Sequence, residues 1–432
     1  MDLQRISGLP GWILHRLFAS YWLLAVCAVL AALPFALAVL WLDRELTTEW
    51  LLTRDLATVA TADTAKDFTG VAAGVNAAFI TLYFSITLIV LSMAAGNLGA
   101  RLIDRWIERP LVRVSLAGLS FSMIVSLVAM LATDAEADLA DTPLLLVGVV
   151  ALLQAINVAM LSVSLHDLGR TMFVDTSIDR LCVDACKRSI DLEPVERSAR
   201  SEHVVLRAPR EGYFEDIDLA KLRDIACDGR AVTLHVAPGQ HVLKGEPILC
   251  SPSDMDKNQV KSAIAIGPYR SDAQGPVFRI RLLVEIAARA LSPAINDFYT
   301  AIACADKLAA VMESQVDSWI DDDRDPALKG CPELVLLGQD FRGLFEDPMS
   351  AFRQAACQYP SVSIRMIDNY GRIAARIERE DGPAQLVDFI RDLARHLRDH
   401  ADSVTQYGMD KRSINAAFDN GFGDGKTAGG HA

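Results

Sequence analysis

Long hydrophobic runs are concentrated in the first 175 residues of the chain. Four runs, at about residues 21–42, 71–98, 111–132 and 143–165, contain no charged residue apart from Arg113 near the start of the third. A helix of about 20 residues rises about 30 Å, which is the thickness of the hydrocarbon core of a bilayer. The pattern therefore predicts an α-helical membrane bundle of four spans within residues 21–170.

The short connections between these runs differ in charge. Four arginines lie at the second connection: Arg101, Arg105, Arg109 and Arg113. Four acidic residues and no basic ones lie at the third: Asp134, Glu136, Asp138 and Asp141. Because short cytoplasmic loops are enriched in Lys and Arg, we expect a multi-pass protein of the bacterial inner membrane with both termini in the cytoplasm. Residues 1–20 are then a cytosolic N-terminus.

Polar residues within the spans form stripes at helical spacing. The candidates for a polar seam or pore are Thr81, Ser85, Ser92, Gln154, Asn157 and Ser164. A polar side chain in hydrocarbon is costly without a partner, so these stripes are expected to face the interior of the bundle. Two interpretations stay open: a pathway for an ion or small solute, and close helix packing through small and hydroxyl residues.

The remainder of the chain reads as a cytosolic α+β part. A helical stalk is expected at 171–202 and a small β-rich module at 203–255. The phrase from Pro238 to Ile248 resembles half of a barrel-sandwich hybrid, in which glycines make tight turns between short strands. It lacks the Met-Lys-Met-like hairpin of a swinging-arm carrier.

An all-α domain is expected at 270–405, followed by a flexible tail at 406–432. One helix ends at Ser292-Pro293, and Asn296 or Asp297 can cap the next. The candidate cytosolic site is Arg289, Ser292, Pro293, Asn296 and Asp297.

Composition excludes several classes of function. The formal net charge of −13 argues against nucleic acid as a partner. No P-loop, HExxH or other catalytic motif is present, so neither an enzyme nor a cofactor is expected. Asp392, His396 and His400 share a helical face that could hold a metal, but neighbouring arginines favour a solvated charged face, and no metal is predicted. Cys182 and Cys186, four residues apart, are expected to be reduced.

Three segments carry a resemblance to a known family: Phe84–Ser92, Gly239–Leu249 and Ala290–Asp297. Together they resemble a bacterial family of predicted membrane proteins, domain of unknown function 2254, from about Tyr21 to Tyr370. The resemblance implies a membrane part followed by a cytosolic part, and it implies no activity.

The sequence leaves two main functional hypotheses. The first is a non-enzymatic, membrane-anchored sensor or regulatory protein whose cytosolic half binds a ligand or partner. The alternative is an oligomeric channel or permease lined by polar residues of the second and fourth spans. The expected partners are the lipid bilayer and further copies of the chain, and the sequence names no soluble partner or ligand.

Overall fold

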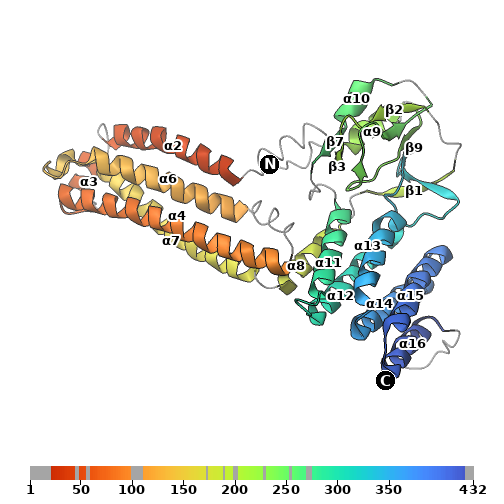
Figure 1. The fold of residues 1–432 in the computed structure, drawn as a ribbon. Coiled ribbons are helices and arrows are strands. Elements are labelled where there is room, and N and C mark those ends of the chain that lie inside the picture. The colour runs from red at the N-terminus through yellow and green to blue at the C-terminus, as the bar shows by residue number, and fades with distance from the viewer. Residues whose placement is uncertain are drawn as a thin grey trace. The chain divides into compact units, whose positions relative to one another are not determined.

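The computed structural model describes residues 21–43, 48–54, 59–98, 110–171, 174–187, 190–197, 203–226, 230–252, 255–268 and 275–423. The chain divides into two units (Figure 1). The N-terminal unit ends at Phe173, and the unit that begins at Val174 is called the C-terminal unit below. Each unit is described by itself.

Four long helices form the N-terminal unit: α2 (Tyr21–Leu42), α4 (Ala62–Leu98), α6 (Pro110–Ala132) and α7 (Leu144–Thr171). Each contains an apolar stretch long enough to cross a bilayer, with mean hydropathy between 2.0 and 2.8. The four predicted spans are confirmed as such helices. Two of these helices are longer than the predicted apolar runs: α4 begins before residue 71 and α7 continues past residue 165. A helix can extend beyond the lipid with polar side chains, so the length of the apolar run does not fix its ends. Two short elements, α3 (Thr48–Thr53) and η3 (Leu139–Asp141), lie in the connections.

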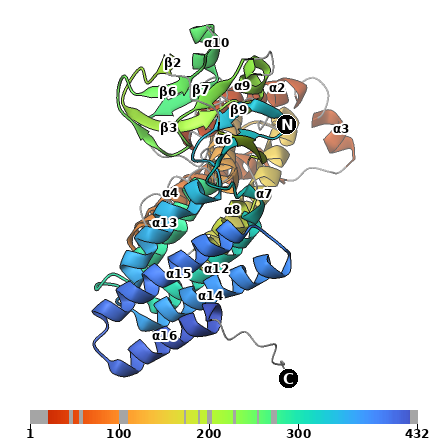
Figure 2. The same cartoon turned by 90° about the vertical axis from the view of Figure 1, so that its right-hand side faces the viewer.

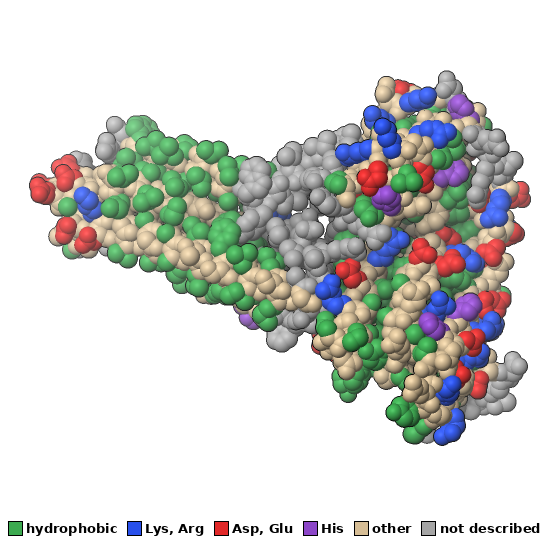
Figure 3. All heavy atoms as spheres, in the orientation of Figure 1, with side chains coloured by type: hydrophobic (Ala, Val, Ile, Leu, Met, Phe, Trp, Pro, Cys, Tyr) green, Lys and Arg blue, Asp and Glu red, His purple; other side chains and the backbone are tan. Residues whose placement is uncertain are grey.

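Small side chains hold these helices close together. Ala32 and Ala36 of α2 are fully buried in one cluster with Val125 and Ala129 of α6. Small residues allow helix backbones to approach each other closely. In lipid, where the hydrophobic effect does not drive helices together, the van der Waals contacts of this close approach stabilise the packing. Larger apolar side chains point outward instead, as Leu131 does with 84% of its surface exposed. Hydrophobic side chains cover this unit in Figure 3, and its acidic residues gather at one end.

The C-terminal unit begins with helix α8 (Val174–Ala185) and continues into two β-sheets. The six-stranded sheet has the order β1 (Leu192–Glu196), β8 (Arg324–Leu328), β9 (Cys331–Leu336), β4 (Val232–Leu234), β6 (Pro247–Cys250), β2 (Val204–Arg207). The three-stranded sheet has the order β5 (His241–Val242), β3 (Gly212–Ile217), β7 (Ile264–Gly267). Neighbouring strands are antiparallel except for β4 and β9, which run parallel.

The two sheets and the short helices α9 (Leu219–Ala226) and α10 (Lys257–Ser262) share one apolar core. Phe214, Leu234 and Ile248 are fully buried in it. Gly239 and Gly245 adopt φ values of 85° and 88°, a left-handed conformation that favours glycine. The predicted glycine turns on either side of β5 are therefore confirmed.

The predicted boundaries of this β module are too narrow. Strand β1 comes from the predicted stalk, and β8 and β9 come from the predicted all-α domain. Within the all-α domain expected over 270–405, the chain is a strand from Cys331 to Leu336 and becomes helical again only at Phe341. In β9, Leu334 and Leu336 are fully buried on one face, which is the two-residue period of a strand. Long-range pairing of β9 with β4 completes the sheet.

Six further helices form three antiparallel hairpins (Figure 2): α11 (Pro276–Ala290) with α12 (Phe298–Ser314), α13 (Phe341–Ala356) with α14 (Pro360–Arg379), and α15 (Ala384–Val404) with α16 (Gly408–Phe422). We call these six helices and α8 the helical array. Helices α8, α12, α14 and α16 run in one direction, and α11, α13 and α15 run in the other. Salt bridges such as Lys307–Asp179, at 2.6 Å, link neighbouring helices.

Helix α16 contradicts the predicted flexible tail over residues 408–422. Its buried side chains Ile414 and Phe418 stand four residues apart and pack onto the array. Gly371 of α14 allows the close approach, because a Cβ there would lie 2.9 Å from the Cα of Gly421. The tail beyond residue 423 lies outside the described residues.

Candidate functional site

Three of the six seam candidates do not face the interior of the bundle. Thr81, Ser85 and Ser92 are exposed on α4. The hydroxyls of Thr81 and Ser85 donate to the carbonyls of residues four positions earlier, at 3.0 and 2.9 Å. A hydroxyl can satisfy itself on its own helix in this way, so it needs no partner helix. The expectation that the α4 stripe faces inward is therefore wrong within this chain.

The other side of α4 carries the buried polar contact. The Asn157 side-chain nitrogen of α7 donates to the Asn76 oxygen at 3.0 Å, and both residues are buried. Ser164 of α7 shares a 2.5 Å hydrogen bond with Ser115 of α6. Asn76 is not among the predicted seam residues, although an amide within an apolar run is itself a sign of a buried polar contact.

A buried carboxylate stabilises the start of α7. The Asp43 carboxylate, just after α2, is only 1% exposed and accepts from the backbone N–H groups of Leu145 and Leu146 at 3.0 and 3.3 Å. A carboxylate at a helix N-terminus meets unpaired N–H groups and the positive end of the helix dipole. Gln154 is half-buried, and among the described residues its Oε1 has no hydrogen-bond partner.

The candidate cytosolic residues lie together at the α11–α12 turn. Asp297 caps α12, accepting from the Thr300 backbone N–H at 3.1 Å and from its hydroxyl at 2.6 Å. Asn296 has a φ of 50°, a left-handed conformation that Asn tolerates better than most residues. The guanidinium of Arg289 lies 3.9 Å from Glu285 on the same helix. Pro293 and Asn296 are exposed, and Ser292 is half-buried. These contacts build a turn, and the capping role of Asp297 is confirmed.

The weak metal candidate lies on α15. Asp392 forms an ion pair with Arg395, and both Asp392 and His396 are exposed, whereas His400 is half-buried. Among the described residues, no group of three or more His, Cys, Asp or Glu side chains lies close enough to hold a metal ion.

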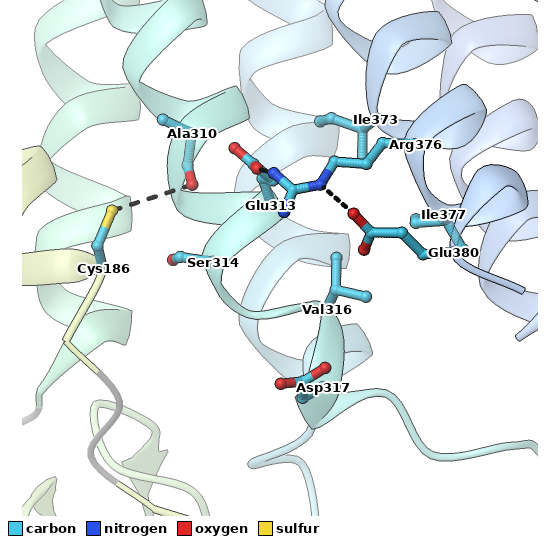
Figure 4. Close-up of a pocket in the computed structure, with 10 residues that line it drawn as sticks. All are labelled: Cys186, Ala310, Glu313, Ser314, Val316, Asp317, Ile373, Arg376, Ile377 and Glu380. Carbon is cyan, nitrogen blue, oxygen red and sulfur yellow. Dashed lines mark hydrogen bonds and ion pairs between the residues drawn. The ribbon is translucent and has the colours of Figure 1, made fainter. Parts of the chain in front are cut away.

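A cleft of about 570 Å³ opens where α8, α12 and α14 meet (Figure 4). The residues lining it are Cys186, Ala310, Glu313, Ser314, Val316, Asp317, Ile373, Arg376, Ile377 and Glu380. Their charged groups come from the C-terminal ends of α12 and α14 and from the 3-10 turn η5 (Val316–Ser318). The lining residues extend over almost 200 positions, from Cys186 to Glu380, so sequence spacing does not predict this cleft.

The charge in this cleft is predominantly negative. The Arg376 guanidinium lies between two carboxylates, with an ion pair to Glu313 and a 3.0 Å contact to Glu380. Asp317 adds a third carboxylate to the lining. The charged side chains that line the cleft are thus three carboxylates and one guanidinium, so its lining is acidic.

Two thiols lie beside the cleft. The Cys182 and Cys186 sulfurs are 4.0 Å apart, and Cys182 donates to the Lys307 carbonyl at 3.6 Å. Burial and the nearby Cys186 raise the pKa of the Cys182 thiol to about 12. At neutral pH Cys182 is therefore a protonated thiol and a poor nucleophile.

An ion-pair cluster joins α12 to α14 near this cleft. Asp306 accepts two hydrogen bonds from Arg365, at 2.7 and 2.9 Å, and one from Asn369 at 2.9 Å. Burial alone raises the pKa of Asp306, but the hydrogen bonds from Arg365 and Asn369 outweigh it and the pKa lies below its ordinary value. The paired carboxylate therefore joins α12 to α14.

Comparison with known proteins agrees with the membrane character of the fold. An uncharacterized protein of Mycobacterium tuberculosis, Rv1290c, is 28% identical over 275 residues, which are 57% of this chain and 52% of that protein. The uncharacterized protein Mb1321c of Mycobacterium bovis matches equally well. The chain thus spans about half the length of the curated relatives it matches. No solved structure matches. The family described as "Predicted membrane protein (DUF2254)" matches residues 19–371. The chain, with its four apolar helices, belongs to this family of predicted membrane proteins.

Proposed function

We propose that this protein is a non-enzymatic, membrane-anchored sensor or regulatory protein whose C-terminal unit binds a small polar ligand with a cationic group. The observation that carries the proposal is the 570 Å³ cleft, whose volume falls in the range of small-molecule sites. Glu313, Asp317 and Glu380 offer acceptors for an ammonium or guanidinium group. Arg376 already forms ion pairs with Glu313 and Glu380. A cationic ligand would replace Arg376 in one of these ion pairs.

The place of the cleft in the fold favours a regulatory role. It lies between α8, which follows the last apolar helix, and the α12–α14 pair. A ligand that bridges these helices would change how firmly α8 is held, because binding stabilises the state that it contacts. Arginines beside the described spans and the acidic third connection support a cytoplasmic site in a bacterial inner membrane.

The interior of the helical bundle supports an anchoring role more than a pathway. The two buried amides of Asn76 and Asn157 are joined to each other, and Ser115 is joined to Ser164. Paired polar groups of this kind are typical of helix packing. The alternative channel would need Thr81, Ser85 and Ser92 to line a pore between copies of the chain, since they are exposed on a single copy.

Thermal unfolding of the full-length protein in detergent tests the proposed site. The probes are arginine, lysine and spermidine, each added over a range of concentrations. A ligand at about 100 times its Kd stabilises the folded state by about 2.7 kcal/mol, so at least one probe is expected to raise the unfolding midpoint. The double variant Glu313→Gln/Asp317→Asn should abolish that rise.

The control variant loses one carboxylate outside the cleft. Asp388→Asn removes a carboxylate of α15 that is exposed and paired with Arg391, away from the cleft. It should retain the full response to the probe. An unchanged midpoint with all three probes, or a response that survives in the double variant, contradicts the proposal.

A further inference from the structure

One end of the helical array collects all three of its hairpin turns and the start of α8. The turns lie between α11 and α12 (291–297), between α13 and α14 (357–359) and between α15 and α16 (405–407). We call this end the turn end. The three turns lie at the same end because α8, α12, α14 and α16 all begin there and α11, α13 and α15 all end there.

Side-chain contacts agree with this assignment. The Tyr359 hydroxyl donates to the Leu291 carbonyl at 2.7 Å, which joins the second turn to the first. Along α8 and α12, Asp179 pairs with Lys307, and Cys186 lies further along, by Ala310. The two helices therefore run in parallel, and Val174 lies at the same end as the α11–α12 turn.

The turn end carries most of the exposed apolar surface of the C-terminal unit. Among the described residues of the C-terminal unit, seven large hydrophobic side chains are exposed. All of them except Val183 and Leu243 belong to the turn end. The five are Ile295, Tyr299, Val404, Tyr407 and Met409. Tyr299, Tyr407 and Met409 are 74%, 75% and 72% exposed. In Figure 3 hydrophobic side chains gather along the lower edge of the array. Such a concentration marks a surface that meets something other than water.

The chain itself indicates what this surface meets. Helix α7, the last apolar helix, ends at Thr171, and α8 begins at Val174. Two residues separate these helices, so the start of α8 follows the last apolar helix closely along the chain. The side chains present suit a lipid headgroup layer, where tyrosine rings and basic residues are favoured. Lys411 and Arg412 lie in the same first turns of α16 as Met409 and Asp410, and Arg412 is exposed.

We propose that the turn end rests on the bilayer that α7 crosses, with Tyr299, Tyr407 and Met409 inserted among the lipid headgroups. This goes beyond the proposed ligand site, which involves different residues at the C-terminal ends of α12 and α14. The array then has a lipid-bound end and a ligand-binding end.

Photo-crosslinking in the full-length protein tests this surface. Tyr299 and Tyr407 are each replaced with p-benzoylphenylalanine, and the protein is reconstituted into vesicles of phosphatidylethanolamine and phosphatidylglycerol. Irradiation should give lipid adducts at both positions, detected by mass spectrometry. Leu243 is the matched control, because it is also apolar and 62% exposed but lies on the β module. The same replacement there should give only background.

Each other outcome overturns the proposal. Equal yields of lipid adducts at positions 299, 407 and 243 would mean that lipid contacts the C-terminal unit without preference for the turn end. Adducts to protein at 299 and 407 would assign the surface to a second copy or another protein. Absence of any adduct at these two positions, with the reagent shown to react in detergent, would leave the turn end in water. Circular dichroism of each substituted protein checks that the fold is retained.

Discussion

The two units of this protein place polar and apolar groups in opposite ways. In the N-terminal unit the buried polar residues include Asn76, Asn157 and Ser115, while Leu88 and Leu131 are exposed. In the C-terminal unit Phe345 and Phe352 are fully buried, and the surface carries ion pairs such as Arg342–Asp322. Helices of the same geometry are therefore adapted to two different solvents. Lipid accepts apolar side chains outside, whereas water requires them inside.

The largest effect that sharpens this comparison is the loss of an aromatic core side chain. Phe352→Ala in α13 removes a fully buried ring and should destabilise the C-terminal unit by about 3–5 kcal/mol, because transfer energy is lost and a cavity remains. The thermal midpoint of the purified protein measures this.

Leu88→Ala is the matched change in the other unit, at a side chain that is 61% exposed. It should leave the midpoint nearly unchanged, because lipid or detergent fills the space. If the two variants lost equal stability, the exposed face of α4 would be a protein-covered face and the comparison would break.

A smaller effect is expected from the amide pair. Asn157→Leu leaves Asn76 without its partner, and Asn76→Leu does the reverse. A double-mutant cycle in micelles, with unfolding followed by SDS titration, should give a coupling of about 0.6–1.7 kcal/mol. A coupling of zero would remove the packing role. Loss of solute flux in liposomes with stability intact would favour the channel alternative.

The smallest effect is a dependence on pH in the C-terminal unit. Since the pKa of Asp306 is lowered in the folded state, its pairing adds stability above the unfolded pKa of about 3.9, and this is lost as the pH falls through the folded pKa. Asp306→Asn should therefore be less stable than the natural protein at neutral pH, and the gap should close in acid.

Asp388→Asn, at an exposed carboxylate of α15, serves as the reference for that pH series. Midpoints measured from pH 7 down to about pH 3 separate the two variants. A gap for Asp306→Asn that stays constant with pH would show that the carboxylate charge does not hold α12 to α14.

The sequence predicted helices and caps well where one local rule decides the outcome. Uncharged apolar runs gave the four long helices, and the Ser292-Pro293 break with Asp297 gave the α11–α12 turn. The predicted flexible tail is wrong over α16, because a glycine-rich segment is typical of flexible chain, whereas Gly421 allows the close approach to Gly371. Gly421 cannot be recognised as a packing residue until α14 lies beside it.

The candidate site was harder to predict. Thr81 and Ser85 lie on a convincing stripe, yet their hydroxyls bond to their own helix and the stripe is exposed. Helical spacing shows which residues share a face, but it does not show which face a neighbouring helix covers. The cleft residues Glu313 and Arg376 share no local pattern at all, and only the packing of α12 on α14 brings them together.

By itself the sequence determined that the first part of the chain forms four apolar helices, because lipid offers no partner for backbone groups and each run must satisfy its own. It also determined the caps and glycine turns, which depend on a few neighbouring residues. Contacts between distant segments alone determine that β9 pairs with β4, that α16 packs on α14, and that Arg376 lies between Glu313 and Glu380. Only the tertiary structure decided those outcomes, because no local periodicity encodes them.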